Sequence, residues 1–152
     1  MDFHSTRDRG ETAPFHKAIL RGLPPGGGLY FPNEIPTVPL ETWAATPDME
    51  PHQLATEILW PFAEGSMGRA DLERICAEAI DFPFPLVETD ERRYALELFH
   101  GPTLAFKDVG ARFLARAISH FSDRKVTVLV ATSGDTGSAV AQGFHGVEGI
   151  DV

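Results

Sequence analysis

The sequence predicts an α/β protein, with a helical N-terminal domain over residues 1–82 and the beginning of an α/β domain over residues 83–152. The first part is predicted from apolar residues that recur every three or four positions in residues 51–62 and 70–80, as on one face of an amphipathic helix. The second part is predicted from residues 126–131, a nearly continuous apolar and β-branched run that is typical of a parallel strand buried on both faces.

The N-terminal part has the pattern of short helices separated by proline-rich turns. Residues 14–22 can hold a short helix, whereas the Pro-Pro-Gly-Gly-Gly stretch within residues 23–32 predicts a turn-rich crossing without a regular element. Three successive glycines also suit a phosphate-binding loop, but the pattern predicts no strand before them and no helix after them, which favours a structural turn. The sequence Asp-Phe-Pro-Phe-Pro at 81–85 excludes a helix and marks the predicted domain boundary.

Beyond the boundary, strands and helices are expected to alternate. The predicted elements are a strand at 93–99, a helix at 108–121, a strand at 126–131, a short helix at 136–145 and the start of a strand at 150–152. A strand–helix–strand run with this spacing is a βαβ unit, so the strands at 93–99 and 126–131 are predicted to be parallel. Because the chain stops inside the last strand, the domain is expected to be truncated.

Lys107 is the residue whose placement most needs an explanation. It ends the uncharged segment at 98–106 and directly precedes a helical pattern, whereas Lys17 and Lys125 lie among polar neighbours. An ammonium group in apolar surroundings loses hydration, and the field of a helix N-terminus acts in the same direction. Both effects favour the neutral amine that attacks a carbonyl carbon. The alternative is a lysine whose head group reaches solvent from an apolar base.

A second loop, Thr-Ser-Gly-Asp-Thr-Gly-Ser at 132–138, follows the second predicted strand. Its glycines permit a tight turn with exposed N–H groups and its hydroxyls add hydrogen bonds, so the loop is suited to bind a carboxylate or a phosphate. The alternative is a loop that only caps the following helix. Since both loops leave the carboxyl ends of parallel strands, we expect them to open at the same edge of the sheet, where ligands bind in α/β folds.

The tripeptide Asp135-Thr136-Gly137 also occurs in aspartic peptidases, in which two such loops share one proton between their carboxylates. Here a helix is predicted to follow the tripeptide, and the sequence contains no second Asp-Thr-Gly or Asp-Ser-Gly. A peptidase would therefore need a second copy of the chain to supply the other aspartate.

Composition narrows the range of partners. Thirteen Lys and Arg against 22 Asp and Glu give a net charge of −9 without a basic cluster, which disfavours nucleic acids and anionic membranes. The lack of a long apolar run and of a leader pattern predicts a soluble, cytoplasmic protein.

The single cysteine, Cys76, falls on the apolar face of its predicted helix, which favours core packing. The six histidines show no paired ligand spacing, so no metal site is expected.

Three segments carry a resemblance to a known family: LFHGPTLAFKD at 98–108, VGARFLAR at 109–116 and VLVATSGDTGSAVA at 128–141. Together they closely resemble threonine synthase, a pyridoxal-phosphate enzyme of the tryptophan-synthase-β-like fold, also called fold type II. In the first half, FHSTRD, GLPPGGGLYFP and EILWPF resemble the helical N-terminal domain of that family. The related dehydratases and cysteine synthases usually have Asn where Asp135 stands, and they lack this N-terminal domain.

The resemblance implies a role for each residue of the two loops. Lys107 would bind pyridoxal phosphate covalently and then act as the proton-transferring base, and Phe106 would pack on the cofactor. Asp135 would lie near the ring hydroxyl of the cofactor. The rest of the second loop would bind the substrate, chiefly its α-carboxylate, through Thr132, Ser133, Gly134, Thr136 and Gly137.

The family converts O-phospho-L-homoserine to L-threonine by eliminating phosphate from Cγ and adding water at Cβ, so the resemblance implies this reaction and this small-molecule substrate. Arg7 is either a ligand of the substrate phosphate or a plain surface arginine. Threonine synthases are much longer, so we expect a truncated portion that is inactive alone and either associates through its unfinished sheet edge or is loosely packed. The alternatives are a non-catalytic remnant or binding module of the same fold, and another fold type II lyase or dehydratase.

Overall fold

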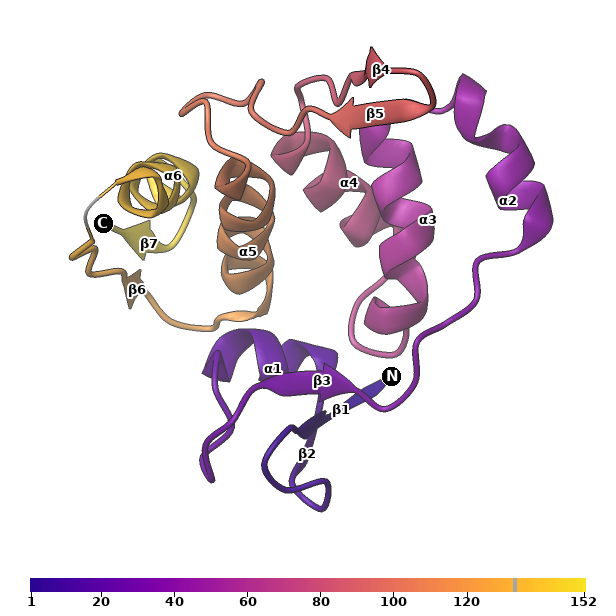
Figure 1. Cartoon of the computed structure of the whole chain (residues 1–152). Coiled ribbons are helices and arrows are strands. Elements are labelled where there is room, and N and C mark those ends of the chain that lie inside the picture. The colour runs from indigo at the N-terminus through magenta and orange to yellow at the C-terminus, as the bar shows by residue number, and fades with distance from the viewer. Residues whose placement is uncertain (133) are drawn as a thin grey trace. The chain divides into compact units, whose positions relative to one another are not determined.

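A computed structural model describes residues 1–132 and 134–152 (Figure 1). The chain divides into two compact units, residues 1–76 and 77–152, and each is described here by itself. The division falls inside helix α4 (Arg69–Ala79), before the boundary predicted at residue 82. The domain limits 1–82 and 83–152 stay a prediction.

The first unit combines helices with a small antiparallel sheet. Its elements are β1 (Asp2–Ser5), β2 (Thr12–Pro14), α1 (Phe15–Arg21), β3 (Tyr30–Pro32), α2 (Leu40–Ala45), a 3-10 turn η1 (Thr46–Asp48), α3 (Pro51–Ala63) and most of α4. The three strands form a sheet in the order β2-β1-β3. The expectation of no regular element in residues 23–32 is therefore wrong, because that segment ends in β3, which pairs with β1.

The helices predicted at 51–62 and 70–80 are confirmed as α3 and α4. Pro51 occupies the first position of α3, where its missing N–H costs nothing, and Gln53 accepts a hydrogen bond from the backbone N–H of Glu50 at 2.9 Å. The apolar face of α4 is fully buried through Leu72, Ile75, Cys76 and Ala79, each 0% exposed. The helical period of apolar residues thus identified the buried face of α4 correctly, whereas in α3 the buried residues are Thr56 and Ala63 and the predicted Ile58 is 36% exposed.

The second unit contains the two loops that the sequence singled out. Its elements are β4 (Leu86–Asp90), β5 (Arg93–Leu96), α5 (Lys107–Phe121), β6 (Val126–Thr127), α6 (Asp135–Phe144) and β7 (Ile150–Asp151). The helices predicted at 108–121 and 136–145 are confirmed, and each begins one residue earlier than predicted. The two helices therefore start at Lys107 and at Asp135.

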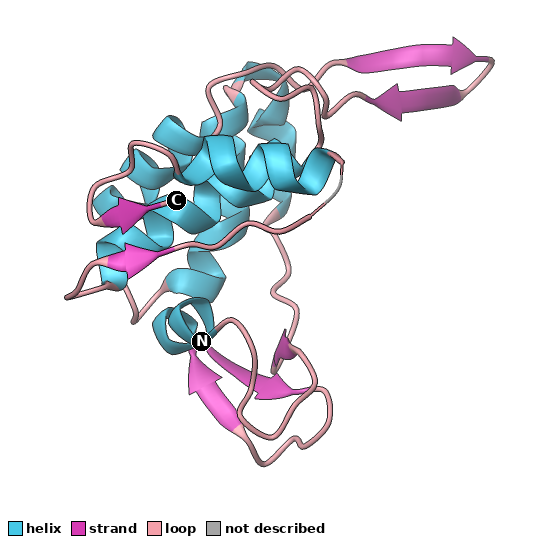
Figure 2. Cartoon of the chain, turned by 90° about the vertical axis from the view of Figure 1, so that its left-hand side faces the viewer, coloured by secondary structure: helices cyan, strands magenta, loops and turns pink. Residues whose placement is uncertain are grey.

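The predicted parallel pairing of the strands at 93–99 and 126–131 is wrong. Strand β5 pairs in antiparallel fashion with β4, and β6 pairs in parallel with β7, so that Figure 2 shows two separate pairs of strands. The physical reason is local, because Arg92 adopts a left-handed φ of 58° and turns the chain directly back onto β4. The βαβ unit of this protein is instead β6-α6-β7. The strand predicted at 126–131 is observed only at Val126–Thr127, and Leu129 is 90% exposed, so the expectation of a strand buried on both faces is wrong.

The core of the second unit lies where α5 and α6 pack together over the short parallel ladder. Ala115, Phe144 and Ile150 form its centre, and five partly buried residues pack around them: Ile118, Val126, Val128, Val140 and Val147. Gly143 permits a close approach of the helices, because a Cβ there would lie 3.1 Å from the backbone of Ala111 and Arg112.

Candidate functional site

The starts of α5 and α6 bring Lys107 and Asp135 into contact. The Nζ atom of Lys107 donates a hydrogen bond to Oδ2 of Asp135 at 3.0 Å, and the two side chains are 33% and 56% exposed. The same Nζ lies 4.6 Å from the centre of the Phe106 ring, which is itself 58% exposed. A primary amine, a carboxylate and an aromatic face thus stand together beside two helix N-termini.

This contact favours the ionised form of Asp135. The hydrogen bond from Lys107 lowers the pKa of the Asp135 carboxyl, and the opposing effect of desolvation is smaller. The charge of Lys107 and the backbone N–H groups of Asp135 and Thr136 act in the same direction as the hydrogen bond. The expectation that Lys107 lies in apolar surroundings is wrong, because its amine is partly exposed and pairs with a carboxylate.

Two glycines shape the loop before and at the start of α6. Gly134 is the N-cap of α6 with a φ of 94°, a left-handed value that glycine tolerates, and no atom lies within 4 Å of the place a Cβ would take. Gly137 lies against Thr132, because a Cβ on Gly137 would come within 2.8 Å of the Thr132 methyl group. Thr136 is half-buried in the first turn of α6. Ser133 lies outside the described residues.

Sequence reasoning missed Asp108, the neighbour of Lys107. Its side chain is 0% exposed, and both of its oxygens accept hydrogen bonds from Thr103, from the backbone N–H at 2.8 Å and from Oγ1 at 2.6 Å. Between these residues Leu104 adopts a left-handed φ of 58° and is 76% exposed. The loop before Lys107 is therefore bound back onto the first turn of α5.

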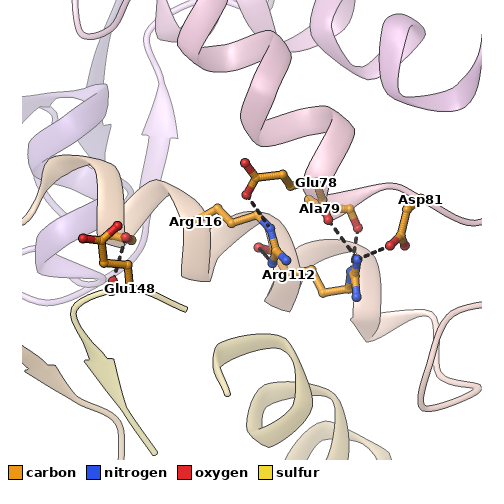
Figure 3. A network of polar contacts seen from close by, with 7 residues as sticks. Glu78, Ala79, Asp81, Arg112, Arg116 and Glu148 are labelled. Carbon is orange, nitrogen blue, oxygen red and sulfur yellow. Dashed lines mark hydrogen bonds and ion pairs between the residues drawn. The ribbon is translucent and has the colours of Figure 1, made fainter. Parts of the chain in front are cut away.

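Further along α5, two arginines make polar contacts with the end of α4, as Figure 3 shows. Arg112 is 8% exposed, and its guanidinium donates to the carbonyl oxygens of Ala79 and Glu78 and pairs with the carboxylate of Asp81, each at 2.8 Å. Arg116 pairs with the Glu78 carboxylate at 3.3 Å. The carbonyl groups that end α4 thus receive their hydrogen bonds from α5.

Burial lowers the pKa of the Arg116 guanidinium, and the nearby charge of Arg112 acts in the same direction. The carboxylates of Glu78 and Asp81 oppose the shift. In the helical pattern of residues 108–121, Arg112 and Arg116 lie opposite the apolar side. The spacing of 108, 112 and 116, one helical turn apart, is the signal that marks them as one face.

The other candidates belong to the first unit. Arg7 is exposed and lies over Gly27, where a Cβ would come within 2.8 Å of Nη1. Cys76 is fully buried, and burial raises the pKa of its thiol.

Among the described residues, no three His, Cys, Asp or Glu side chains are grouped to hold a metal ion. In the same part of the chain, no helix has the length and apolar character needed to span a membrane.

The chain is similar in sequence to proteins of a known family. Residues 2–80 match the family model described as threonine synthase N terminus. The chain belongs to the threonine synthase family. It is 42% identical over 154 residues to the threonine synthase of Haemophilus influenzae and 37% identical over 153 residues to that of Escherichia coli. Both alignments cover the whole chain and 36% of the relative.

Solved structures of threonine synthases show the same fold. The crystal structure of the Escherichia coli threonine synthase matches with a TM-score of 0.88 at 37% identity, over 99% of this chain and 35% of that one. The PLP-bound threonine synthase from Brucella melitensis matches with a TM-score of 0.92 at 40% identity, over 99% and 34%. The chain thus spans about a third of the length of the threonine synthases that it resembles. The resemblance seen in the sequence and the α/β class are confirmed.

Proposed function

We propose that this chain supplies the cofactor-holding lysine and the substrate-carboxylate loop of a pyridoxal-phosphate-dependent threonine synthase. The observation that carries the proposal is the 3.0 Å contact between Lys107 and Asp135, which joins the two sequence motifs of the family in one place. The reaction is the conversion of O-phospho-L-homoserine and water to L-threonine and inorganic phosphate. A cytoplasmic location, expected from the sequence, belongs to the same proposal.

The residues present fit pyridoxal phosphate. Lys107 offers a primary amine that is 33% exposed, which an aldehyde in solution can reach, and Phe106 offers an exposed ring for stacking. The space next to Gly134 is open on the side where a Cβ would stand. When bound, the cofactor supplies an electron sink for the Cα of the substrate.

Each side chain then has a defined task. Lys107 holds the cofactor and afterwards moves a proton at Cα through its Nζ. The carboxylate of Asp135 orients Nζ through the hydrogen bond described above and lies near the ring hydroxyl. Backbone N–H groups at the start of α6 bind the α-carboxylate of the substrate, because they have no partner within the helix and carry partial positive charge. The residues proposed for the substrate are Thr132, Ser133, Gly134, Thr136 and Gly137.

We expect no turnover from the 152 residues alone. Lys107 and Asp135 stand one-third and more than one-half exposed, whereas the reaction needs a pocket that excludes water. The phosphate anchor of the cofactor and the walls of that pocket would come from the remaining two-thirds of the length of a threonine synthase, which this chain does not match. Self-association through exposed strand edges stays a prediction.

Borohydride trapping tests the proposal. The chain is incubated with pyridoxal phosphate and reduced, and the labelled lysine is identified by peptide mass analysis. We expect the label on Lys107 and its loss in Lys107→Arg, whereas Lys125→Arg, the matched control, should keep it. Label distributed equally over Lys17, Lys107 and Lys125 would contradict the assignment, because free aldehyde in solution labels any accessible amine.

A further inference from the structure

Asp108 is a buried carboxylate for which the proposed chemistry has no direct use. It follows Lys107 in the first turn of α5, is 0% exposed, and receives both of its hydrogen bonds from Thr103. A buried carboxylate is costly unless it is hydrogen-bonded, so these two bonds fix both partners. The loop between them cannot move without breaking them.

The carboxylate is closely packed on the side of Gly101. A Cβ on Gly101 would lie 2.6 Å from Oδ2 of Asp108, 2.9 Å from its Cβ and 3.0 Å from the Phe82 ring. Phe82 in turn lies under the guanidinium of Arg112, at 5.9 Å from its ring centre. Asp108 and Arg112 therefore anchor the same face of α5, one turn apart.

We propose that Asp108 is a positioning residue for Lys107. This inference rests on the proposed function, in which Lys107 holds the cofactor. Consecutive residues of a helix point about 100° apart. When Asp108 and Arg112 are held inside, the rotation of α5 about its axis is fixed, and Lys107 faces the start of α6. Thr103 contributes to this anchoring, because its hydrogen bonds to Asp108 hold the preceding loop against the first turn of α5.

The reactivity of the Lys107 amine distinguishes a positioning role of Asp108 from a purely structural one. The hydrogen bond to Asp135 and the Phe106 ring hold Nζ of Lys107 in place, so Lys107 should react with an acylating reagent more slowly than an exposed lysine that must break no such contact. Lys17, which is exposed, provides the internal reference in the same protein. If Asp108 positions Lys107, loss of the Asp108–Thr103 bonds should weaken the contact with Asp135 and raise the reactivity of Lys107.

The experiment measures competitive acetylation of the chain without cofactor, as the ratio of label on Lys107 to label on Lys17. Asp135→Asn, which removes the ion pair, should raise this ratio by about two- to fivefold, the range expected for an exposed ion pair. Asp108→Asn and Thr103→Val should raise it by a similar factor while circular dichroism shows a folded chain. Thr103→Ser, which keeps the hydroxyl, and Asp123→Asn, which removes an exposed carboxylate beyond the other end of α5, should match the unsubstituted protein.

An unchanged ratio in folded Asp108→Asn or Thr103→Val, alongside a raised ratio in Asp135→Asn, would overturn the inference. Loss of the fold in both of these variants would overturn it as well, because Asp108 would then be a core residue only. An unchanged label ratio in Asp135→Asn would also count against the inference, because the Lys107–Asp135 contact would then not affect the reactivity of Lys107. The labelling uses no cofactor, so failed borohydride trapping would refute the proposed function and leave this result standing.

Discussion

The carbonyl oxygen of Ala79, the last residue of α4, accepts a hydrogen bond from Nε of Arg112 at 2.8 Å. The carbonyl of Glu78 accepts a second one from Nη2 at 2.8 Å. A helix ends with carbonyl groups that have no partner within the helix, and a buried helix end needs other donors. One arginine side chain supplies two of them and also carries the positive charge that the C-terminus of a helix favours.

Arg112→Ala should lower the free energy of unfolding by about 1–3 kcal/mol, because two carbonyl groups lose their donors and one of the donated bonds is fully buried. Arg112→Lys should recover only part of the loss, since an ammonium cannot reproduce the planar fork. Urea unfolding measures both changes. Arg124→Ala, an exposed arginine beyond α5, is the control and should change stability by less than about 0.5 kcal/mol. An equal effect of Arg112→Ala and Arg124→Ala would contradict this role of Arg112.

Lys107→Gln should raise the pKa of Asp135 toward its ordinary value of 3.8, because the hydrogen bond from Lys107 is the main cause of the lowered value. A carboxyl whose pKa is lower in the folded state contributes stability above its unfolded pKa and loses that contribution as the pH falls through the folded value. Acidification below about pH 4 should thus cost the unsubstituted protein stability that the variant lacks from the start. Carboxyl carbon NMR titration measures the pKa, and Lys125→Gln should leave it unchanged. The same titration curve for Asp135 in both variants would refute the contact.

Gly101→Ala should destabilise the fold by roughly 1–3 kcal/mol, since the new methyl group would overlap Asp108 and Phe82 in a packed interior. Gly110→Ala is the matched control. No atom lies within 4 Å of its added Cβ, and alanine in a helix is about 0.5–1 kcal/mol more favourable than glycine. Opposite signs in urea unfolding are therefore expected, and a Gly101→Ala variant as stable as the unsubstituted protein would show that Gly101 is not tightly packed.

Cys76 should react slowly with a thiol reagent at pH 8 in the native protein and rapidly in denaturant. Its side chain is 0% exposed, and burial raises the pKa of its thiol, an effect that a hydrogen bond with Thr56 opposes but does not cancel. Both factors reduce the amount of accessible thiolate, which is the reactive species. The absorbance of released thionitrobenzoate gives the rate. Complete labelling of the native protein within seconds would contradict the buried position of Cys76.

The sequence was a good guide to the helices, because each of them carries its own local signal. Pro51 marks the start of α3, and the recurrence of Leu72, Ile75 and Ala79 marks the buried face of α4. The contact of Lys107 with Asp135 was expected from two loops at one sheet edge. The structure brings the two residues together, but by the packing of α5 against α6 instead of the pairing of two parallel strands.

Sequence reasoning failed where the pairing partner of a strand or a charged residue cannot be recognised from residue type and spacing. A turn at Arg92 decides that β5 pairs with β4, and no alternating pattern distinguishes an antiparallel hairpin from a parallel neighbour. Asp108 and Arg112 were not recognised as buried, because charged residues at helical spacing usually face solvent. Their spacing places them on one helix face, but only their hydrogen bonds to the Thr103 hydroxyl and the Ala79 carbonyl show that this face is buried.

The short parallel ladder sets an order of events when the chain folds. The N–H of Val126 donates to Gly149 at 2.9 Å and that of Val128 to Asp151 at 2.8 Å, so each bond closes a long segment that contains all of α6. Closing such a segment costs chain entropy before any bond repays it, whereas a helix forms from near neighbours within microseconds. The amides of Val126 and Val128 should therefore become protected from hydrogen exchange only after those of α6, and they report when the crossover is complete.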